Sequence, residues 1–430
     1  MNLQDFIDQK NNFYTVVLSF LEDSNDDLNE DFKKHYSKKF LESHDELDNF
    51  LKMIVNIANN HHRNPNFFEK IKIILLAFEK EIKQTLSNYE IFHYFENNKR
   101  ILLLLIENSI LTIDSFIIQM IESKTEPNGQ KFSDYFIPEI CKFKNIEYPK
   151  EYSDDIYEYE RNRHLGENSL WICSLIRQDL VEDFISHVTQ LVIPLSTTIK
   201  SSVFETNPFL NEHEPTLIEY SAFFGSIQIF QYLFTNNAKV TDSIMLYSIH
   251  SNNSDFYRHK IEENKIPPIN YRYDNCLFES IKCHHNDFAN YISTNFISNH
   301  YYEDQVQQEY KVFLKCLKYS NYAFISTDLI TNIKEDDLFY YFCKYKLTEF
   351  AKILLDSKKD EIESLHNMPI KEAIKEDKLM ILYYLLMQKN EISDEYFKGN
   401  IDMKRIILPP SIKTIKENAF YGCSSLKKIV

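Results

Sequence analysis

The 430-residue sequence predicts an all-α protein: a solenoid of stacked helical pairs, preceded by a helical N-terminal domain and followed by a short tail of β/α type. Three observations carry this prediction. Apolar residues recur every three or four positions through the first 123 residues. The spacing of segment 214–233 then returns about every 30 residues, which is typical of repeats of paired helices. At Arg405 the composition changes to a pattern that fits neither region.

Residues 1–123 are predicted to form the helical N-terminal domain. Pro65 marks a helix start, and helices are expected over about 90–106 and 112–121, with Asp114 in the first turn of the second. Residues 124–164 form a connecting region, because Pro127, Pro138 and Pro149 interrupt an acidic, tyrosine-rich stretch. The apolar residues at helical spacing in the N-terminal domain include Leu3, Phe6, Ile7, Phe13, Val17, Phe50, Met53, Ile54, Ile57, Phe67, Ile71, Ile74 and Leu75.

Residues 165–398 are predicted to hold about seven degenerate repeats. In the best preserved one, Ala222 is the small packing residue of the first helix, Gly225 is the turn and Leu233 closes the second helix. An early, atypical repeat begins near Trp171 and is followed by a long insertion around 194–208. We call the residue equivalent to Ala222 the anchor of a repeat. The same spacing recurs when it is counted from the later anchors Ile249, Ile281, Leu317, Phe342 and Ile374.

The turn position of these repeats departs from the usual glycine. The whole chain holds only five glycines, and Gly225 alone occupies this position. Asn252, His284, Ser320, Tyr345 and Asp377 stand at the equivalent positions. Because Asn and Asp tolerate left-handed backbone and Tyr does not, we expect the Leu317 and Phe342 repeats to be the most distorted.

Segment 214–233 resembles one helical pair of the ankyrin repeat. Thr216 stands where the usual Thr-Pro-Leu-His motif begins, and its hydroxyl can accept hydrogen bonds from the free N–H groups of the helix start. Pro369 takes the matching proline position in the last repeat, where a proline in the first turn costs the helix nothing. Such pairs bury their apolar stripes only by stacking, and the stack exposes one elongated concave surface.

The resemblance implies that the residue after each anchor faces a partner on that concave surface. Phe223 is then an exposed aromatic, and the three lysines would suit an acidic protein or peptide. We expect Phe223→Ala with Lys282→Ala to weaken partner capture and to leave thermal unfolding unchanged. The six concave-face residues are Phe223, His250, Lys282, Lys318, Cys343 and Lys375.

Composition narrows the choice of partners and location. The formal net charge of −16 and the lack of a long basic cluster disfavour nucleic acid. The first residues lack the basic start and apolar core of a secretory signal, and no apolar run reaches the roughly 20 residues that span a bilayer. Seven scattered cysteines fit reduced thiols. We therefore expect a cytoplasmic protein without a membrane span.

No catalytic, metal or cofactor site is predicted. Cys276, Cys283, His284 and His285 form the densest Cys/His group and would suit zinc, but no second Cys-x-x-Cys pair completes four ligands. His61 and His62 precede a predicted helix, where turn and capping roles are more common than catalysis. Phosphate loops are excluded because the glycines are far apart. A helical enzyme within residues 1–160 stays an open alternative, although nothing there gathers an acid, a base and a nucleophile.

The tail from Ile406 resembles one unit of the BspA-like leucine-rich repeats. Its Ile-Leu-Pro-Pro-Ser-Ile start and its Ala-Phe-Tyr-Gly-Cys-Ser-Ser-Leu centre match the hallmark of that family. We predict a single unit over 401–430. Since one unit cannot bury a core, it must dock on the last helical pair, fray, or be what remains of a longer array. Such repeats occur in cell-surface proteins, so a surface or adhesion role is the alternative to an intracellular scaffold.

The chain as a whole resembles a family of ankyrin-repeat proteins of parasitic single-celled eukaryotes. Segments 59–71, 98–102 and 176–179, together with the first ankyrin-like pair, carry this resemblance. It implies a helical N-terminal half of unknown function, degenerate ankyrin repeats and, in some members, a leucine-rich tail. The expected role is a binding scaffold, and the family brings no catalytic residues.

Overall fold

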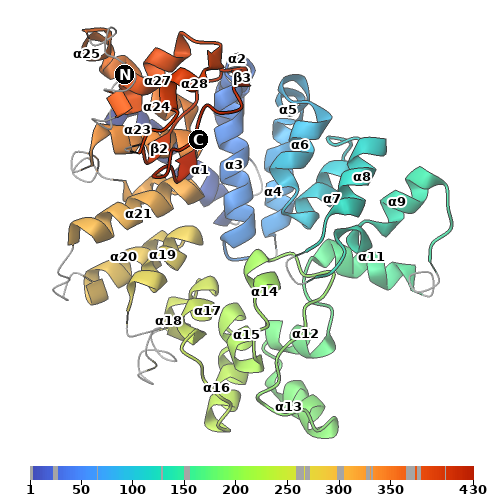
Figure 1. The fold of residues 1–430 in the computed structure, drawn as a ribbon. Coiled ribbons are helices and arrows are strands. Elements are labelled where there is room, and N and C mark those ends of the chain that lie inside the picture. The colour runs from blue at the N-terminus through green and yellow to red at the C-terminus, as the bar shows by residue number, and fades with distance from the viewer. Residues whose placement is uncertain are drawn as a thin grey trace. The chain divides into compact units, whose positions relative to one another are not determined.

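The computed structural model describes residues 3–22, 28–64, 66–126, 129–149, 155–257, 266, 272–297, 305–325, 330, 333–364, 373–374, 379–401 and 403–430. Helices dominate, as predicted, and the paired strands β1 to β4 all lie after residue 390 (Figure 1). None of the described helices is both long and apolar enough to cross a lipid bilayer.

The chain divides into two compact units. The larger unit is Val17–Glu303, and the smaller unit combines Met1–Val16 with Asp304–Val430, so the division falls inside α1 (Leu3–Glu22). The domain boundaries predicted from sequence pattern, at 123, 164 and 398, are not decided by this division and stay predictions.

The described elements of the larger unit after α1 are helices. They are α2 (Glu30–Glu42), α3 (His44–Asn60), α4 (Phe67–Ala77), α5 (Glu79–Thr85), α6 (Asn88–Phe95), α7 (Lys99–Glu107), α8 (Ser115–Ser123), η1 (Phe132–Tyr135), α9 (Ile137–Lys144), α11 (Ile156–Leu165), α12 (Trp171–Arg177), α13 (Val181–Gln190), α14 (Pro208–Glu212), α15 (Leu217–Phe224), α16 (Ile227–Thr235), α17 (Ile244–His250), α18 (Ser254–Phe256), α19 (Asp274–Lys282), α20 (Asn286–Ile292) and η4 (Ser293–Ile297).

The smaller unit combines helices with short strands. Its elements after α1 are α21 (Gln305–Tyr319), η5 (Tyr322–Phe324), α23 (Glu335–Lys344), α24 (Thr348–Ser357), α25 (Lys359–Ser364), α27 (Leu379–Met387), β1 (Glu391–Ile392), α28 (Asp394–Phe397), β2 (Arg405–Ile406), β3 (Thr414–Ile415) and β4 (Lys428–Ile429).

The N-terminal helices of the larger unit form where sequence periodicity predicts them, with one difference. The helix expected over 90–106 is two helices, α6 and α7, because the Asn98 side chain accepts a hydrogen bond from the Ile101 N–H and starts a new helix. Asp114 caps α8 in the same way. Pro65 lies outside the described residues. The rings of Phe40, Phe50 and Phe78 pack against one another, with centroids 4.9 to 5.3 Å apart, and form part of the core.

Four helical pairs follow in the described part of the larger unit: α12 with α13, α15 with α16, α17 with α18, and α19 with α20. Their first helices contact one another in chain order, α12 on α15, α15 on α17 and α17 on α19 (Figure 1). Asp179, Gly225, Asn252 and His284 occupy the turns with φ between 48° and 67°, so each pair turns in left-handed backbone. Three of these residues, Gly225, Asn252 and His284, are those predicted from the spacing.

The smaller unit repeats this pattern in α21 with η5 and in α23 with α24. Ser320 has the predicted left-handed conformation, with φ of 56°. Tyr345 does not: its φ is −91°, and Lys346 takes the turn instead with φ of 57°. The turn is therefore rearranged by one residue, which spares Tyr345 the steric penalty of left-handed backbone. Asp377 lies outside the described residues.

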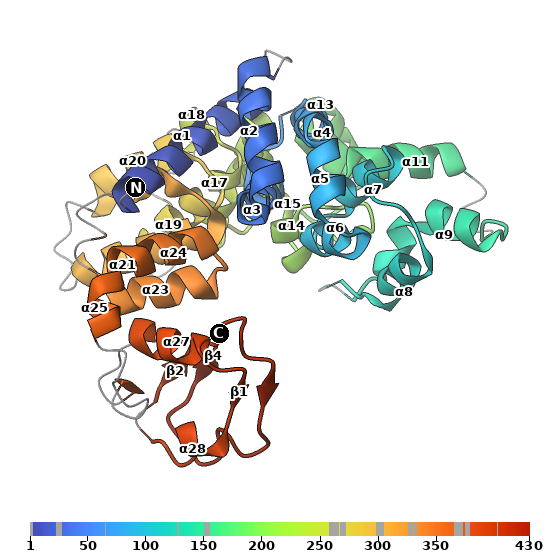
Figure 2. The same ribbon diagram turned by 90° about the horizontal axis from the view of Figure 1, so that it is seen from above.

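The C-terminal residues form two successive turns in parallel register. Strand β1 pairs with β3, and β2 pairs with β4; partners are 23 positions apart in both ladders, from 391 to 414 and from 405 to 428. At the same offset, Phe397 stacks on Phe420 with ring centroids 5.3 Å apart. The repeat thus begins near Glu391, before the single unit predicted over 401–430. Figure 2 shows these turns, with α28 on the side away from α27.

Candidate functional site

The structure brings three of the predicted concave-face residues together in the larger unit. Phe223 stacks on the His250 ring at 4.8 Å, and Lys282 donates to Glu279, which also bonds His250. Of the others, Lys318 is exposed and Cys343 half-buried in the smaller unit, and Lys375 lies outside the described residues. Whether any of the six binds a partner stays a prediction.

Phe223 is not the exposed aromatic that the sequence predicts. It is 6 % exposed, and His250 is 3 % exposed. The cause is the insertion after α13, which folds back as α14 and places Phe209 against this face. The Phe209 ring lies 4.3 Å from His250, 6.0 Å from Phe223 and 5.4 Å from the Lys282 ammonium. Truncating Phe223 would leave a cavity, so the burial of this ring argues against the expectation of unchanged unfolding.

The end of α3 lies against the same helical pairs. His61 Nδ1 is 2.9 Å from the Cys283 carbonyl oxygen, and the His62 N–H donates to His285 Nε2 at 3.3 Å. Burial, and then the nearby His61, lowers the pKa of His62 to about 4. The first residues after α3 thus attach the N-terminal helices to α19 and its turn. Sequence reasoning assigned His61 and His62 to a turn, which fits, but could not show what they contact.

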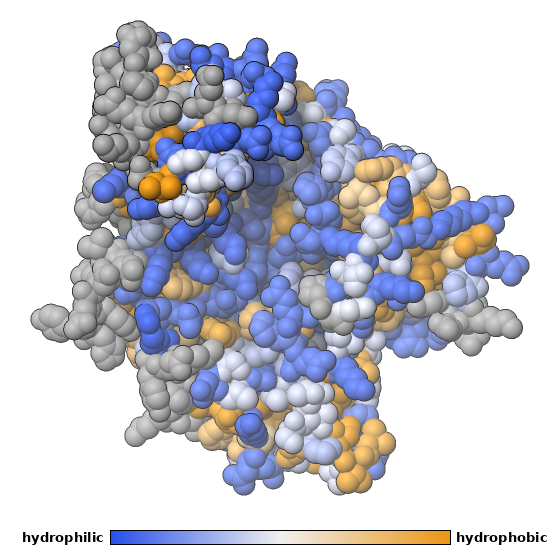
Figure 3. Space-filling model, viewed as in Figure 1, coloured by the Kyte–Doolittle hydropathy of each residue, from blue (hydrophilic) through white to orange (hydrophobic). Residues whose placement is uncertain are grey.

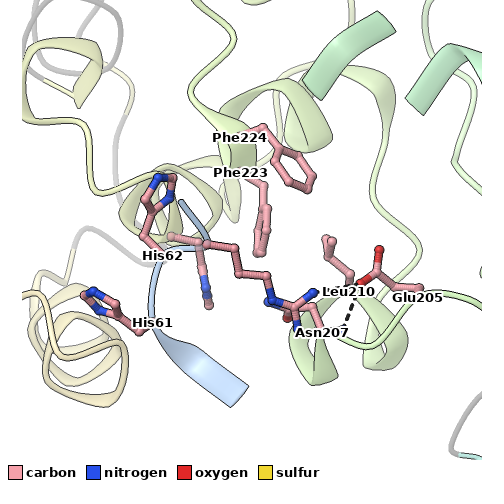
Figure 4. Close-up of a pocket in the computed structure, with 9 residues that line it drawn as sticks. His61, His62, Glu205, Asn207, Leu210, Phe223 and Phe224 are labelled. Carbon is pink, nitrogen blue, oxygen red and sulfur yellow. Dashed lines mark hydrogen bonds and ion pairs between the residues drawn. The ribbon is translucent and has the colours of Figure 1, made fainter. Parts of the chain in front are cut away.

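A small cavity lies where these segments meet, as Figure 4 shows. Its volume of about 20 Å³ is enough for a single water molecule. Arg63 lies in its wall, and among the described residues its Nε and Nη2 atoms have no hydrogen-bond partner. The Glu205 carboxylate, 3.7 Å from Arg63 Nη1, accepts from the Asn168 and Asn207 N–H groups. The lining residues are His61, His62, Arg63, Glu205, Asn207, Leu210, Phe223, Phe224 and His250.

One group of side chains in the described part of the chain has the composition and spacing of a metal site. His250, Glu279 and Cys283 each offer one ligand atom, and these atoms lie within 4.8 Å of one another. The Cys/His group noted in the sequence contributes only Cys283 to this cluster. Glu279 was missed, although its spacing of four residues from Cys283 places both on one face of α19.

Apolar side chains are exposed at the first helical pair. Leu170 and Trp171 begin α12, and Leu191 and Val192 follow α13. Trp171, the chain's one tryptophan, is 59 % exposed and Val192 is 82 % exposed. Because the turn 178–180 joins the two helices, both dipeptides lie at the opposite end of the pair from the turn. Figure 3 shows hydrophobic surface over this region, where α13 lies.

Comparison with protein families finds a match at the C-terminus. The model of the BspA type leucine rich repeat region (6 copies) matches residues 389–430. This confirms the resemblance noted in the tail and includes the earlier turn that begins at β1. No curated protein and no solved structure matches the chain. No ankyrin-repeat family matches the helical pairs, so the ankyrin resemblance and the link to parasite proteins stay predictions.

Proposed function

We propose that this chain is a non-catalytic scaffold that binds another protein, built from ankyrin-type helical pairs and ending in leucine-rich turns. The observation that supports it is the repeated pair with a left-handed turn, whose first helices contact one another in order. Repeats of this kind present extended surfaces rather than closed pockets. The leucine-rich match points in the same direction, toward protein interaction or a surface role. The proposal places the protein in the cytoplasm and assigns it no catalytic residue.

The binding surface we propose is the exposed edge of the first pair, formed by Leu170, Trp171, Leu191 and Val192. The concave face predicted from sequence is covered around Phe223 by α14, whereas this edge is open. Trp is among the residues that most often dominate binding energy in protein interfaces. An exposed tryptophan beside exposed aliphatic residues is therefore a suitable centre for a protein contact.

Backbone strain at Val192 supports the same edge. Val192 follows the end of α13 with φ of 52°, a conformation that β-branched residues rarely adopt. Its N–H donates to the Thr189 carbonyl, and the Ile193 N–H donates to the Val188 carbonyl, so the turn is held in place. Glycine would relieve the strain. Because valine is less stable than glycine in this conformation, the exposed Val192 side chain is a candidate for a functional role.

Affinity capture with two matched baits tests which repeat binds. The full chain is immobilised and incubated with native lysate from its source, and the captured proteins are identified by mass spectrometry. Trp171→Ala removes an exposed aromatic from the helical pairs, and Tyr421→Ala removes one from the leucine-rich turns. We expect Trp171→Ala to lose the main captured protein and Tyr421→Ala to retain it. Equal capture by Trp171→Ala and the unchanged bait would remove this edge from consideration.

The leucine-rich match favours a second candidate function, adhesion at the cell surface through the C-terminal turns. In that case Tyr421→Ala, not Trp171→Ala, would lose the partner. Labelling intact cells with a membrane-impermeant reagent separates the two locations. A cytoplasmic scaffold stays unlabelled until the cells are lysed, whereas a surface protein reacts in intact cells.

A further inference from the structure

Two neighbouring helical pairs bring a histidine, a glutamate and a cysteine to one point in the larger unit. His250 is the last residue of α17, and Glu279 and Cys283 belong to α19 and its C-terminal cap. The spacing of four residues puts the two α19 side chains on the same helix face, one turn apart. Because α17 packs against α19, that face meets His250.

The distances within this cluster suit a tetrahedral metal ion. His250 Nε2 lies 3.0 Å from Glu279 Oε1, and Cys283 Sγ lies 3.8 Å from His250 Nε2. Ligands bound to zinc at about 2.0 to 2.3 Å in tetrahedral geometry are roughly 3.3 to 3.6 Å apart. Small side-chain movements would therefore bring the three ligand atoms to the vertices of such a site.

The chemistry of the cluster is selective. A thiolate and an imidazole favour zinc and similar transition metals over magnesium and calcium, which prefer oxygen ligands. His250 and Cys283 are buried, and the Glu279 side chain is only slightly exposed.

One cation competes for this position. The Lys282 ammonium lies 2.8 Å from Glu279 Oε1, the same oxygen that bonds His250. A metal ion would have to displace it. Lys282 is partly exposed and its ammonium also lies over the Phe209 ring, so the side chain can move aside without losing all its contacts.

We propose that His250, Glu279 and Cys283 bind one divalent transition-metal ion of the zinc type, with water in the fourth position. The ion would join the end of α17 to the end of α19 and so connect two consecutive helical pairs. Binding would stabilise the larger unit in proportion to the free ion concentration, because the unfolded chain does not hold the three ligands together. The site differs from the proposed protein-binding edge and does not depend on it.

Cobalt and zinc alone serve as probes for the test. The full-length chain, stripped of metal with a chelator under reducing conditions, is titrated with Co²⁺ and read by absorption spectroscopy, and zinc stoichiometry is measured by equilibrium dialysis. We expect one ion per chain, a thiolate-to-cobalt charge-transfer band, and visible bands of tetrahedral intensity. Absence of the charge-transfer band, or no stoichiometric zinc, would overturn the proposal.

Matched variants locate the site. Cys283→Ala is expected to abolish the band, while Cys276→Ala, a buried cysteine on the same helix outside the cluster, should retain it. Glu279→Gln preserves shape and should weaken binding at least tenfold. Lys282→Met removes the competing cation and should tighten binding several-fold. Circular dichroism checks that both cysteine variants fold. Equal loss of the band in two folded cysteine variants, or weaker binding in Lys282→Met, would contradict the assignment.

Discussion

The helical pairs and the leucine-rich turns both contain left-handed turns, but different residues occupy these turns in the two regions. The pairs place Asp179, Asn252 and His284 in this conformation. The leucine-rich turns place Gly399 and Gly422 there. A β-carbon on Gly422 would lie 3.2 Å from the Gly399 α-carbon, so a side chain there would require this neighbour to shift by a few tenths of an ångström. The described helical pairs thus form the left-handed turn with or without glycine, whereas both described leucine-rich turns use glycine.

The two leucine-rich turns also differ from one another in what covers their apolar residues. Ile392, Phe397 and Ile406 of the first turn are buried. Ile415 and Ile429, which pair with Ile392 and Ile406 in the second turn, are exposed. The stability of this region therefore depends mainly on the first turn. The leucine-rich repeat motif is weaker in the sequence of this turn than in the second.

The largest effect we predict is at Phe397. Phe397→Ala removes a buried ring that stacks on Phe420, and it should destabilise the turns by about 3 to 5 kcal/mol, as large-to-small core changes do. Hydrogen exchange of residues 391–430 measures this locally, without requiring the whole chain to unfold in two states. Tyr421→Ala, on an exposed side chain of the second turn, is the control and should change exchange little. Equal protection from hydrogen exchange in both variants would show that the stability of residues 391–430 does not depend mainly on the first turn.

The next prediction compares two glycines, one of which is expected to require only left-handed backbone and the other also close packing. Gly399 and Gly422 have φ of 74° and 76°, and a β-carbon at Gly399 would meet nothing within 4 Å. Gly399→Ala should therefore cost about 1 to 2 kcal/mol from the left-handed conformation alone. Gly422→Ala should cost more, because its β-carbon also approaches the Gly399 backbone. Hydrogen exchange of the same segment measures the loss of stability in each variant. Equal losses would mean that the two turns can move apart enough to accommodate the β-carbon at Gly422.

The sequence predicts the repeats well because their determinants are local. Helical periodicity and the need for left-handed backbone depend on nearby residues, so Asn252, His284 and Ser320 were found at the right positions. Lys346 was missed because the length of α23, not the spacing, decides where that turn begins.

The contacts that define the candidate sites were not predictable in the same way. The cover of Phe223 by Phe209 depends on how the insertion after α13 folds back, which no periodicity records. The first leucine-rich turn did leave a signal that sequence reasoning overlooked. Phe397 and Gly399 precede Phe420 and Gly422 by the same 23 positions that separate the paired strands, from 391 to 414.

A moderate effect is expected at the contact between the first two helical pairs. Both Asp179 carboxylate oxygens accept from the Gln228 N–H, and one also accepts from the Ile229 N–H at 2.9 Å, so the turn of one pair caps α16 of the next. Asp179→Ala should destabilise the larger unit by about 1 to 2 kcal/mol. Asp179→Asn, which keeps an acceptor and tolerates the turn, should recover much of this. Urea unfolding followed by circular dichroism checks the order, and an alanine variant as stable as asparagine would exclude the cap.

The smallest effect is a pH-dependent one at Glu219, in the best preserved helical pair. Its carboxylate accepts from the Thr216 N–H and hydroxyl and from the Ser243 hydroxyl. Burial raises the pKa of Glu219, but these hydrogen bonds outweigh it and hold the pKa below the ordinary value of 4.5. A lowered carboxyl pKa contributes stability above pH 4.5 that is lost as the pH falls through the folded-state pKa.

Glu219→Gln should therefore destabilise α15 at pH 7, by less than Asp179→Ala, and the difference from the unchanged chain should shrink steadily below pH 4.5. Urea unfolding at a series of pH values measures it. Glu417→Gln, on an exposed side chain of the leucine-rich turns, serves as the control and should leave the unfolding of the larger unit unchanged. A Glu219→Gln deficit that persists unchanged at low pH would mean that the side chain acts through shape rather than charge. The capping box of this pair would then owe its stability to packing, as the leucine-rich turns do.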